Sequence, residues 1–185
     1  NRMRVISGSA RGVTLVTLEG LETRPTAEKV KEAMFSAINF DLPGAHVLDI
    51  YAGSGQLGIE ALSRGASDCT FVERSRAACA VIRKNIEKAK FSEKSRVITA
   101  DCEIFLSQKS RGYDIIISDP PYRKGTPDAI LPMLADLTAE GGLVLLETER
   151  GYQAPAQCGG LRLHKTYHYG NTAVHLYRKP SQETP

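Results

Sequence analysis

Five short apolar segments between residues 46 and 147 constrain the fold more than any other feature of the chain. Each is rich in aliphatic, often β-branched residues at successive positions, which is typical of strands buried on both faces. The segments are HVLDI (46–50), CTFVE (69–73), RVITA (96–100), DIIIS (114–118) and LVLLE (143–147). Stretches with helical periodicity separate them, at 57–64, 75–90, 102–109 and 127–137. Buried strands that alternate with helices predict a parallel α/β sheet.

The end of the chain follows a different pattern. Residues 161–179 predict two strands that fold back on each other through Gly170-Asn171, a hairpin signal. A parallel sheet that ends in an antiparallel pair is more specific than a general doubly wound fold.

The beginning of the chain predicts a small extension. Residues 3–17 contain two strand-like segments, MRVIS and VTLVT, joined by a turn at GSARG. A helix should follow over Thr26–Asn39, with Pro25 before it and Thr26 as its N-cap. We therefore expect a hairpin and helix extension at 1–42 and a main domain at 43–185, the two acting as one domain.

The composition is that of a soluble globular protein, with 42% hydrophobic and 24% charged residues in a chain of 185. No apolar run approaches the ~18 residues of a membrane helix, and the first residues lack the apolar core of a signal peptide. The cysteines have no C-x-x-C spacing and no close histidine, which favours small core residues over metal ligands or disulfides. They are Cys69, Cys79, Cys102 and Cys158. We expect a cytoplasmic monomer without a bound metal.

The net charge is only +3, but basic residues gather near both ends of the chain. Six lie in the first 31 residues, against three glutamates: Arg2, Arg4, Arg11, Arg24, Lys29 and Lys31. This weak basic footprint is compatible with nucleic-acid binding and equally with an ordinary solvated surface.

A glycine-rich segment, DIYAGSGQLGIEAL, begins at Asp49, where the first predicted strand ends. Gly53, Gly55 and Gly58 match the pattern G-x-G-x-x-G, which lets backbone N–H groups approach a ligand at a helix N-terminus. Because any tight turn from strand to helix favours glycine, the pattern alone also fits a purely structural turn. We interpret Gly58 as a helix-packing residue.

Acidic residues end three successive predicted strands, at Asp49, Glu73 and Asp101. Open α/β sheets bind ligands at this edge. An acid before the glycine turn does not help to bind the anionic pyrophosphate of a dinucleotide, but it favours S-adenosylmethionine, which carries a sulfonium and an ammonium group. Glu73 would then bind both ribose hydroxyls, and Asp101 would accept a hydrogen bond from the adenine amine. The pattern predicts an S-adenosylmethionine site rather than a nicotinamide or flavin site.

The fourth predicted strand ends in SDPPY, with Asp119, Pro120, Pro121 and Tyr122 at the corner. Proline removes N–H donors and restricts the residue before it, so the Asp119 carboxylate and the Pro120 carbonyl form a rigid pair of acceptors. They would accept the two protons of a nucleobase amine and stabilise the charge that develops on its nitrogen. Tyr122 would stack on the base. A strand-terminating turn with a packing tyrosine is the structural alternative.

These residues resemble the amino-methyltransferases with a Rossmann-like fold, whose motif is [DNS]-P-P-[YFW]. Nearly the whole chain is similar to the bacterial 16S ribosomal RNA guanine-N2 methyltransferase family, which modifies the small subunit. The similar blocks are RVISGSARG, TRPTAEKVKEAMF (23–35), LDIYAGSGQLGIEALSRGA (48–66), DPPY (119–122) and YGNTAVHLYRK (169–179). The resemblance implies a seven-stranded, mostly parallel sheet with an antiparallel C-terminal strand. It also implies methyl transfer to a guanine N2 in 16S ribosomal RNA, and we expect the substrate to be the small-subunit particle.

By position, the resemblance implies the roles of individual residues. Asp49, Gly53 and Gly55 would line the methionine end of the cofactor, Glu73 the ribose and Asp101 the adenine. We add the neighbouring Ala52, Ser54 and Cys102 to the expected cofactor contacts. The segment Arg24-Pro25-Thr26 would lie over the active site, and the expected RNA contacts are Arg11, Arg24, Thr26 and Tyr122. Ala27 and Glu28 stand where family members commonly have Thr and Asp.

Three other functions remain open from the sequence. Adenine-N6 methylation of DNA or RNA uses the same DPPY motif, although the chain lacks an obvious target-recognition domain. A non-catalytic RNA-binding assembly factor would keep the fold but would not need an intact DPPY. An NAD-linked oxidoreductase would leave both Asp49 and DPPY without a role.

Overall fold

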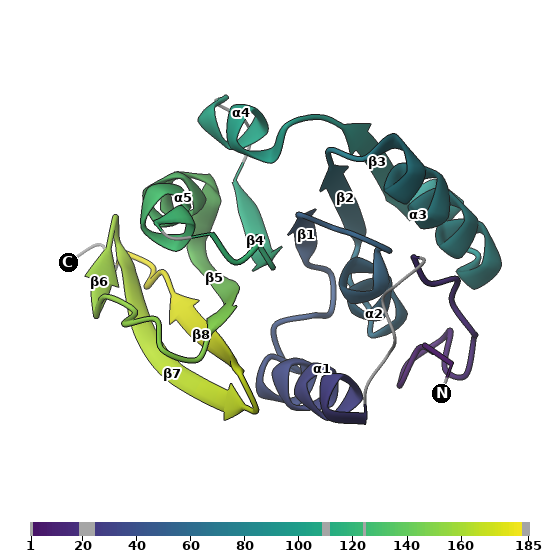
Figure 1. The fold of residues 1–185 in the computed structure, drawn as a ribbon, viewed down its shortest axis with the longest axis horizontal. Coiled ribbons are helices and arrows are strands. Elements are labelled where there is room, and N and C mark those ends of the chain that lie inside the picture. The colour runs from purple at the N-terminus through teal and green to yellow at the C-terminus, as the bar shows by residue number, and fades with distance from the viewer. Residues whose placement is uncertain (1, 19–24, 109–111, 124, 183–185) are drawn as a thin grey trace.

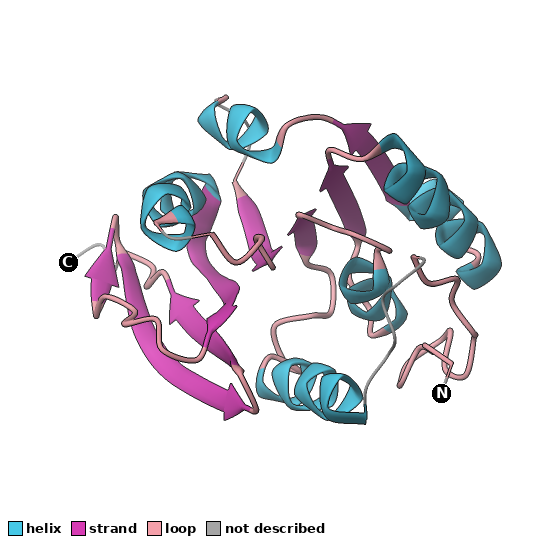
Figure 2. Cartoon of the chain, in the orientation of Figure 1, coloured by secondary structure: helices cyan, strands magenta, loops and turns pink. Residues whose placement is uncertain are grey.

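The computed structural model describes residues 2–18, 25–108, 112–123 and 125–182. Its helices are α1 (Pro25–Ala37), α2 (Gln56–Ser63), α3 (Arg76–Ala89), α4 (Cys102–Ser107) and α5 (Thr126–Leu137), with a short 3₁₀ turn at Ser92–Lys94. Its strands are β1 (His46–Ile50), β2 (Asp68–Glu73), β3 (Ser95–Thr99), β4 (Tyr113–Ser118), β5 (Thr138–Glu149), β6 (Gln157–Cys158), β7 (Leu161–Tyr169) and β8 (Thr172–Arg178). Figures 1 and 2 show these elements as one sheet with helices on both sides.

The described strands form one eight-stranded sheet in the order β3-β2-β1-β4-β5-β8-β7-β6. Strands β1 to β5 pair in parallel, and β8 pairs antiparallel with β5 and with β7. The predicted parallel sheet with an antiparallel end is therefore confirmed. The expected seven strands become eight because the short β6 adds to the free edge of β7.

Two apolar cores lie on opposite faces of the sheet. The first core lies under α1, α2 and α3, and its sheet residues are Val47, Cys69, Phe71, Ile115, Ile117, Leu143, Leu145, Val174 and Leu176. The second core lies under α4 and α5, and its sheet residues are Leu48, Ile50, Val72, Tyr113, Ile116, Val144, Leu146, Leu161 and Tyr177. Successive residues of β1, β4 and β5 thus alternate between the cores, as the two-residue period of a strand requires.

Helix α1 packs in the first core together with residues of β8. Phe35 and Ile38 are fully buried there, in the same cluster as Val174. The guanidinium of Arg178 on β8 donates to both carboxylate oxygens of Asp41, at 3.0 and 3.2 Å. The beginning and the end of the chain are therefore joined across one face of the sheet.

The N-terminal segment differs from the predicted hairpin. Its two arms meet in a single antiparallel bridge, Arg4 with Thr14, rather than in two strands. Much of its backbone bonds to α2 instead, where Ser9 N–H donates to the carbonyl of Ser63 at 2.8 Å. Helix α1 begins at Pro25, so Thr26 lies inside the first helical turn and not at the N-cap. Proline suits this first position because an N–H group there would have no acceptor within the helix, so no helical hydrogen bond is lost.

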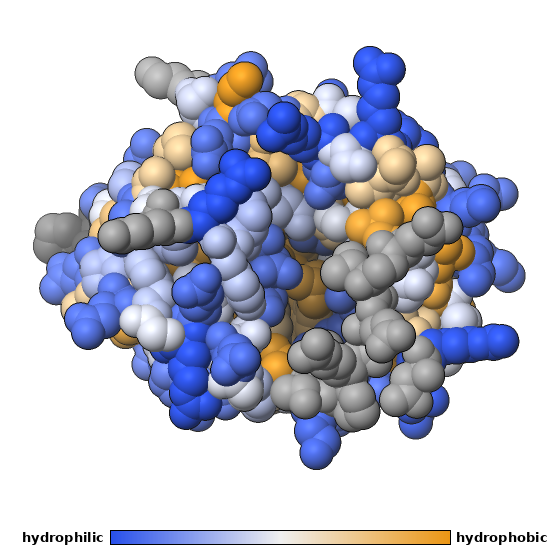
Figure 3. All heavy atoms as spheres, viewed as in Figure 1, coloured by the Kyte–Doolittle hydropathy of each residue, from blue (hydrophilic) through white to orange (hydrophobic). Residues whose placement is uncertain are grey.

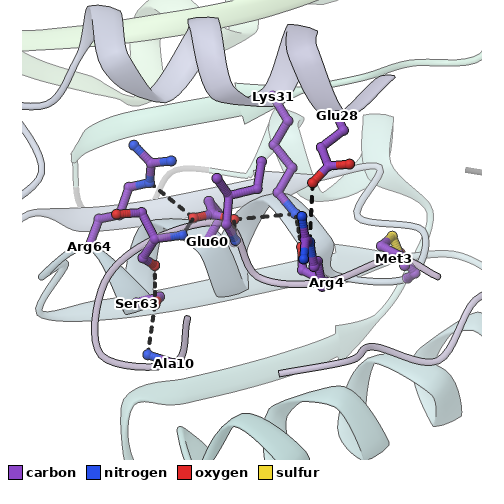
Figure 4. A network of polar contacts seen from close by, with 12 residues as sticks. Met3, Arg4, Ala10, Glu28, Lys31, Glu60, Ser63 and Arg64 are labelled. Carbon is purple, nitrogen blue, oxygen red and sulfur yellow. Dashed lines mark hydrogen bonds and ion pairs between the residues drawn. The ribbon is translucent and has the colours of Figure 1, made fainter. Parts of the chain in front are cut away.

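A buried carboxylate on α2 joins the N-terminal segment to two helices (Figure 4). Glu60 is fully buried and accepts hydrogen bonds from the N–H groups of Ile6 and Ser7, at 2.9 and 3.1 Å. It also pairs with Lys31 of α1 at 3.3 Å and with Arg64 at 3.0 Å. Both of its oxygens therefore have charged and neutral donors, which a buried carboxylate needs.

Replacing Glu60 should destabilise the fold strongly, because Glu60→Ala leaves the buried Lys31 ammonium without its carboxylate. We expect the free energy of unfolding to fall by about 3–5 kcal/mol, measured by urea denaturation. Glu28→Ala is the matched control, since the Glu28–Arg4 ion pair lies at the surface. It should change stability by less than ~1 kcal/mol, and equal losses in both variants would contradict the role given to Glu60.

Candidate functional site

Acidic residues lie together where the parallel strands end. In the sheet register, Ile50 of β1 is opposite Ser118 of β4, and Ser118 is opposite Leu146 of β5. Each of these positions has an acid as its neighbour in sequence: Asp49, Asp119 and Glu147. The structure places Asp49 and Asp119 at the same edge, close enough for their charges to interact, and Glu147 lies at this edge as well.

Asp49 points from β1 toward α2. It is 2% exposed, and its carboxylate accepts a hydrogen bond from the N–H of Gly58 at 3.0 Å. Burial raises the pKa of Asp49 well above its usual range; the Gly58 bond opposes this, and the charges of Asp119 and Glu73 add to it. A cation bound beside this group would offset the cost of its ionisation.

Gly58 is a packing residue, as predicted. A Cβ at this position would lie 2.4 Å from the ring of Phe71 and 2.7 Å from the Cys69 sulfur. Only a residue without a side chain lets α2 approach β2 so closely, and this approach brings its N–H within reach of Asp49.

The glycine loop turns sharply between β1 and α2. Gly53 and Gly55 have φ of 59° and 78°, in the left-handed region that favours glycine. A Cβ on Gly53 would meet no atom within 4 Å, so this part of the loop faces open space. Ala52 before Gly53 and Ser54 between the two glycines are buried, and the Ser54 carbonyl accepts from the Asn85 side chain at 2.9 Å.

Glu73 ends β2 and supports the loop. One of its oxygens accepts from the N–H of Gly53 at 3.3 Å, and the other from the N–H of Ser75 at 2.6 Å. Ser75 in turn caps α3, where its hydroxyl accepts from the N–H of Ala78. The carboxylate therefore fixes the glycine loop relative to the start of the next helix.

The third predicted acid, Asp101, caps α4. Its carboxylate accepts from the N–H of Ile104 at 2.9 Å, and Cys102 beside it is buried. A carboxylate has further lone pairs for another donor. Its predicted contact with adenine stays a prediction.

The DPPY corner leaves β4 beside the start of β8. The Pro121 carbonyl accepts from the N–H of Arg123 at 2.7 Å, which closes a tight turn. Tyr122 is 52% exposed, and its hydroxyl lies 3.2 Å from that of Thr172. The ring is therefore held at one end and open to solvent along its face.

Asp119 and Glu147 share a hydrogen bond across the ends of β4 and β5. The Asp119 residue is exposed at the surface, but its carboxyl group is crowded by protein atoms, and this loss of solvation is the main cause of its raised pKa. Burial raises the pKa of Asp119 to about 6. Burial, followed by repulsion from Asp119, raises the pKa of Glu147 to about 8.

Two residues of this edge were not singled out in the sequence. Glu147 has the signal that identified the others, an acid at the end of an apolar strand. Tyr51 directly follows the first strand at a φ of 59°, unusual for a residue with a side chain, and its buried hydroxyl has no hydrogen-bond partner among the residues that the structure describes. No sequence signal indicates that strained conformation.

The predicted RNA contacts are only partly described. Arg11 is exposed on the N-terminal segment, and Thr26 lies on α1. Arg24 lies outside the described residues.

His175 on β8 is buried between the hydroxyls of Thr148 and Thr166, at 2.8 and 2.9 Å.

Figure 3 shows the same face as Figure 1, and its surface is hollowed near the middle of the view, over the region of β1. Within the described ranges, no helix is long and apolar enough to cross a membrane, and no group of three or more His, Cys, Asp or Glu side chains could hold a metal ion. The strand-end acids instead suit a positively charged organic ligand.

Known proteins resemble this chain over nearly its full length. The sequence profile of the family described as Conserved hypothetical protein 95 matches residues 3–178. Ribosomal RNA small subunit methyltransferase D of Escherichia coli (strain K12) is 33% identical, over 98% of this chain and 92% of its own. YlbH of Bacillus subtilis (strain 168) is 37% identical, over 96% and 99%.

A solved structure agrees with the sequence relatives. That of yhhF from Escherichia coli is 34% identical, with a TM-score of 0.88 over 98% of this chain and 100% of its own. The resemblance drawn from the motifs is thereby confirmed. The chain belongs to the Conserved hypothetical protein 95 family, together with the ribosomal RNA small subunit methyltransferases D.

Proposed function

We propose that the protein transfers a methyl group from S-adenosylmethionine to the exocyclic N2 amine of a guanine in 16S ribosomal RNA. The observation that carries this proposal is the placement of the DPPY corner next to Asp49, at the ligand-binding edge of the sheet. The names of the relatives support ribosomal RNA as the substrate. The choice of guanine N2 rests on the motif blocks, of which DPPY alone also fits adenine.

The residues of the edge fit S-adenosylmethionine. Asp49 supplies a negative charge beside the open glycine loop, where the positively charged methionine end would bind. Glu73 and Asp101 follow on the next strands, in the order that ribose and adenine require. When bound, this cofactor supplies an activated methyl group.

The chain itself positions and activates the target amine. A nucleobase amine is a weak nucleophile because its lone pair is delocalised into the ring. Asp119 and the Pro120 carbonyl accept its two N–H bonds, localise the lone pair and stabilise the positive charge that forms on nitrogen. Tyr122 offers its open face to the base, and such stacking contributes roughly 1–3 kcal/mol. This offsets the few kcal/mol needed to extract a base from its stack.

Substrate recognition in this proposal extends beyond the catalytic corner. Arg11, Arg24 and Thr26 contact RNA, and the modest basic footprint of a small chain obtains its specificity from the shape of the small-subunit particle. The protein acts on this substrate as a monomer in the cytoplasm.

Methyl-labelled S-adenosylmethionine tests the reaction directly. With unmodified small subunits, label should appear in one guanine of 16S ribosomal RNA, identified by nuclease digestion and mass spectrometry. Label confined to adenine would overturn the base assignment. Stripped 16S RNA should react more slowly than particles, and equal rates would refute the particle preference.

Two variants separate chemistry from cofactor binding. Asp119→Ala should lower the rate of methyl transfer about 10²–10³-fold, because one acceptor of the amine is lost, while cofactor affinity stays within about twofold. Asp49→Asn should keep an oxygen for the Gly58 N–H but remove the charge. It should weaken cofactor binding at least tenfold, the scale of a lost charged hydrogen bond, as measured by calorimetry.

The pattern of losses decides the assignment. Equal losses of rate and affinity in Asp119→Ala would contradict its role at the amine. Unchanged affinity in Asp49→Asn would mean that the methionine end binds elsewhere.

A further inference from the structure

We infer that Glu147 is a positioning residue for Asp119, which holds the Asp119 carboxyl group toward the target amine and keeps one proton shared between the two. This inference rests on the proposed function, because that function assigns Asp119 to the amine. It adds a residue of β5 that lies outside the DPPY motif and outside the expected cofactor contacts.

The register of the sheet places the two residues side by side. Ser118 of β4 is opposite Leu146 of β5 in a parallel pairing. Asp119 directly follows Ser118 in the sequence, and Glu147 directly follows Leu146. Leu145 faces the first core and Leu146 the second, so Glu147 returns to the first face. The Asp119 charge also acts on Asp49, which points to this face. The register and the face of the sheet therefore place the two residues as neighbours, and their carboxyl groups meet in a side-chain hydrogen bond.

The hydrogen bond between these groups requires a proton. Two ionised carboxylates are acceptors only, so at least one member of a bonded pair must be protonated. The raised pKa values of Asp119 and Glu147, about 6 and about 8, describe this pair as a unit. Between those values the pair holds one proton and one negative charge.

The charges around the pair do not replace this proton. Asp49 faces it from β1, and Tyr122 lies near it from the DPPY corner, where the charge of Glu149 also acts on the tyrosine. On β8, the residue opposite Glu147 is the apolar Val174. Among the described residues, no cation contributes to the pKa shift of either Asp119 or Glu147. The shared proton is therefore what allows the two carboxyl groups to lie in contact.

The arrangement has a direct consequence for methyl transfer. The bond from the amine nitrogen to the methyl carbon forms as the bond from that carbon to sulfur breaks, and the electron pair of the broken bond stays on sulfur. The nitrogen then carries one proton too many and passes it to Asp119. The pair, now holding two protons, releases one to water and returns to its starting charge. Glu147 thus keeps Asp119 oriented before the reaction and stabilises it after proton transfer.

The pH dependence of single-turnover methylation of unmodified small subunits tests this role. In the unchanged protein the rate should fall below pH about 6, because a second proton then blocks Asp119 as an acceptor. It should fall again above about 8, where the shared proton is lost and the carboxylates repel each other. Glu147→Gln retains an N–H donor for Asp119 without a titrating proton. In this variant the rate should still fall at low pH, the acid limb of the profile, but should no longer fall at high pH, the alkaline limb.

Two further variants complete the test. Glu149→Gln removes an exposed acid two residues further along β5, and should leave both limbs in place. Glu147→Leu removes the hydrogen bond, and should lower the single-turnover rate at least about tenfold with cofactor affinity unchanged within about twofold. A merely structural role for Glu147 would instead lower the melting temperature without changing the shape of the pH profile.

The outcomes distinguish this inference from the proposed function. An alkaline limb that persists in Glu147→Gln overturns the inference, even if Glu147→Leu fails to fold. If the unchanged protein labels ribosomal RNA and Asp119→Ala does not, while both Glu147 variants behave like the unchanged protein, only the inference falls. If the unchanged protein labels no RNA, the proposed function itself fails.

Discussion

Electrostatic repulsion between aligned carboxyl groups is the constraint on which the ligand-binding edge depends. Parallel pairing of β1, β4 and β5 brings Asp49, Asp119 and Glu147 to one edge: Ser118 of β4 is opposite both Ile50 and Leu146, and each of these three residues has one of the acids as its neighbour in sequence. Each group is stabilised in its own way. Asp49 has the Gly58 N–H, and Asp119 and Glu147 have each other. In the proposed function, the negative charge that remains at this edge attracts the positively charged end of the cofactor.

The helices and the N-terminal segment around this edge are held together by attractive ion pairs. Glu60 is fully buried like Asp49, but Lys31 and Arg64 surround it with positive charge. It therefore acts as a junction between the N-terminal segment, α1 and α2. One face of the molecule thus contains a neutralised carboxylate that supports the fold and un-neutralised ones that are available to a ligand.

The sequence predicted most of the fold because its strands are apolar at successive positions. Both faces of such strands must be buried, which requires a sheet covered on both sides. β1 was predicted over its full observed range, and the acids at 49, 73 and 101 end their strands or follow them as expected. The N-terminal hairpin was wrong in its extent, since its backbone bonds to Ser63 and Glu60, more than fifty residues away. Glu147 was missed although it ends an apolar segment as the other acids do; its closeness to Asp119 became visible only through the register between β4 and β5.

The bond between Asp41 and Arg178 has a consequence for how the chain reaches its native state. These residues are 137 positions apart, and α1 shares its core with Val174 and Leu176 of β8. During synthesis α1 leaves the ribosome early, yet the surface that covers its apolar face is made almost last. Such long-range closure slows folding, because the entropy of bringing distant segments together is lost before their contacts form. The contacts between α1 and β8 therefore form only when the chain is nearly complete.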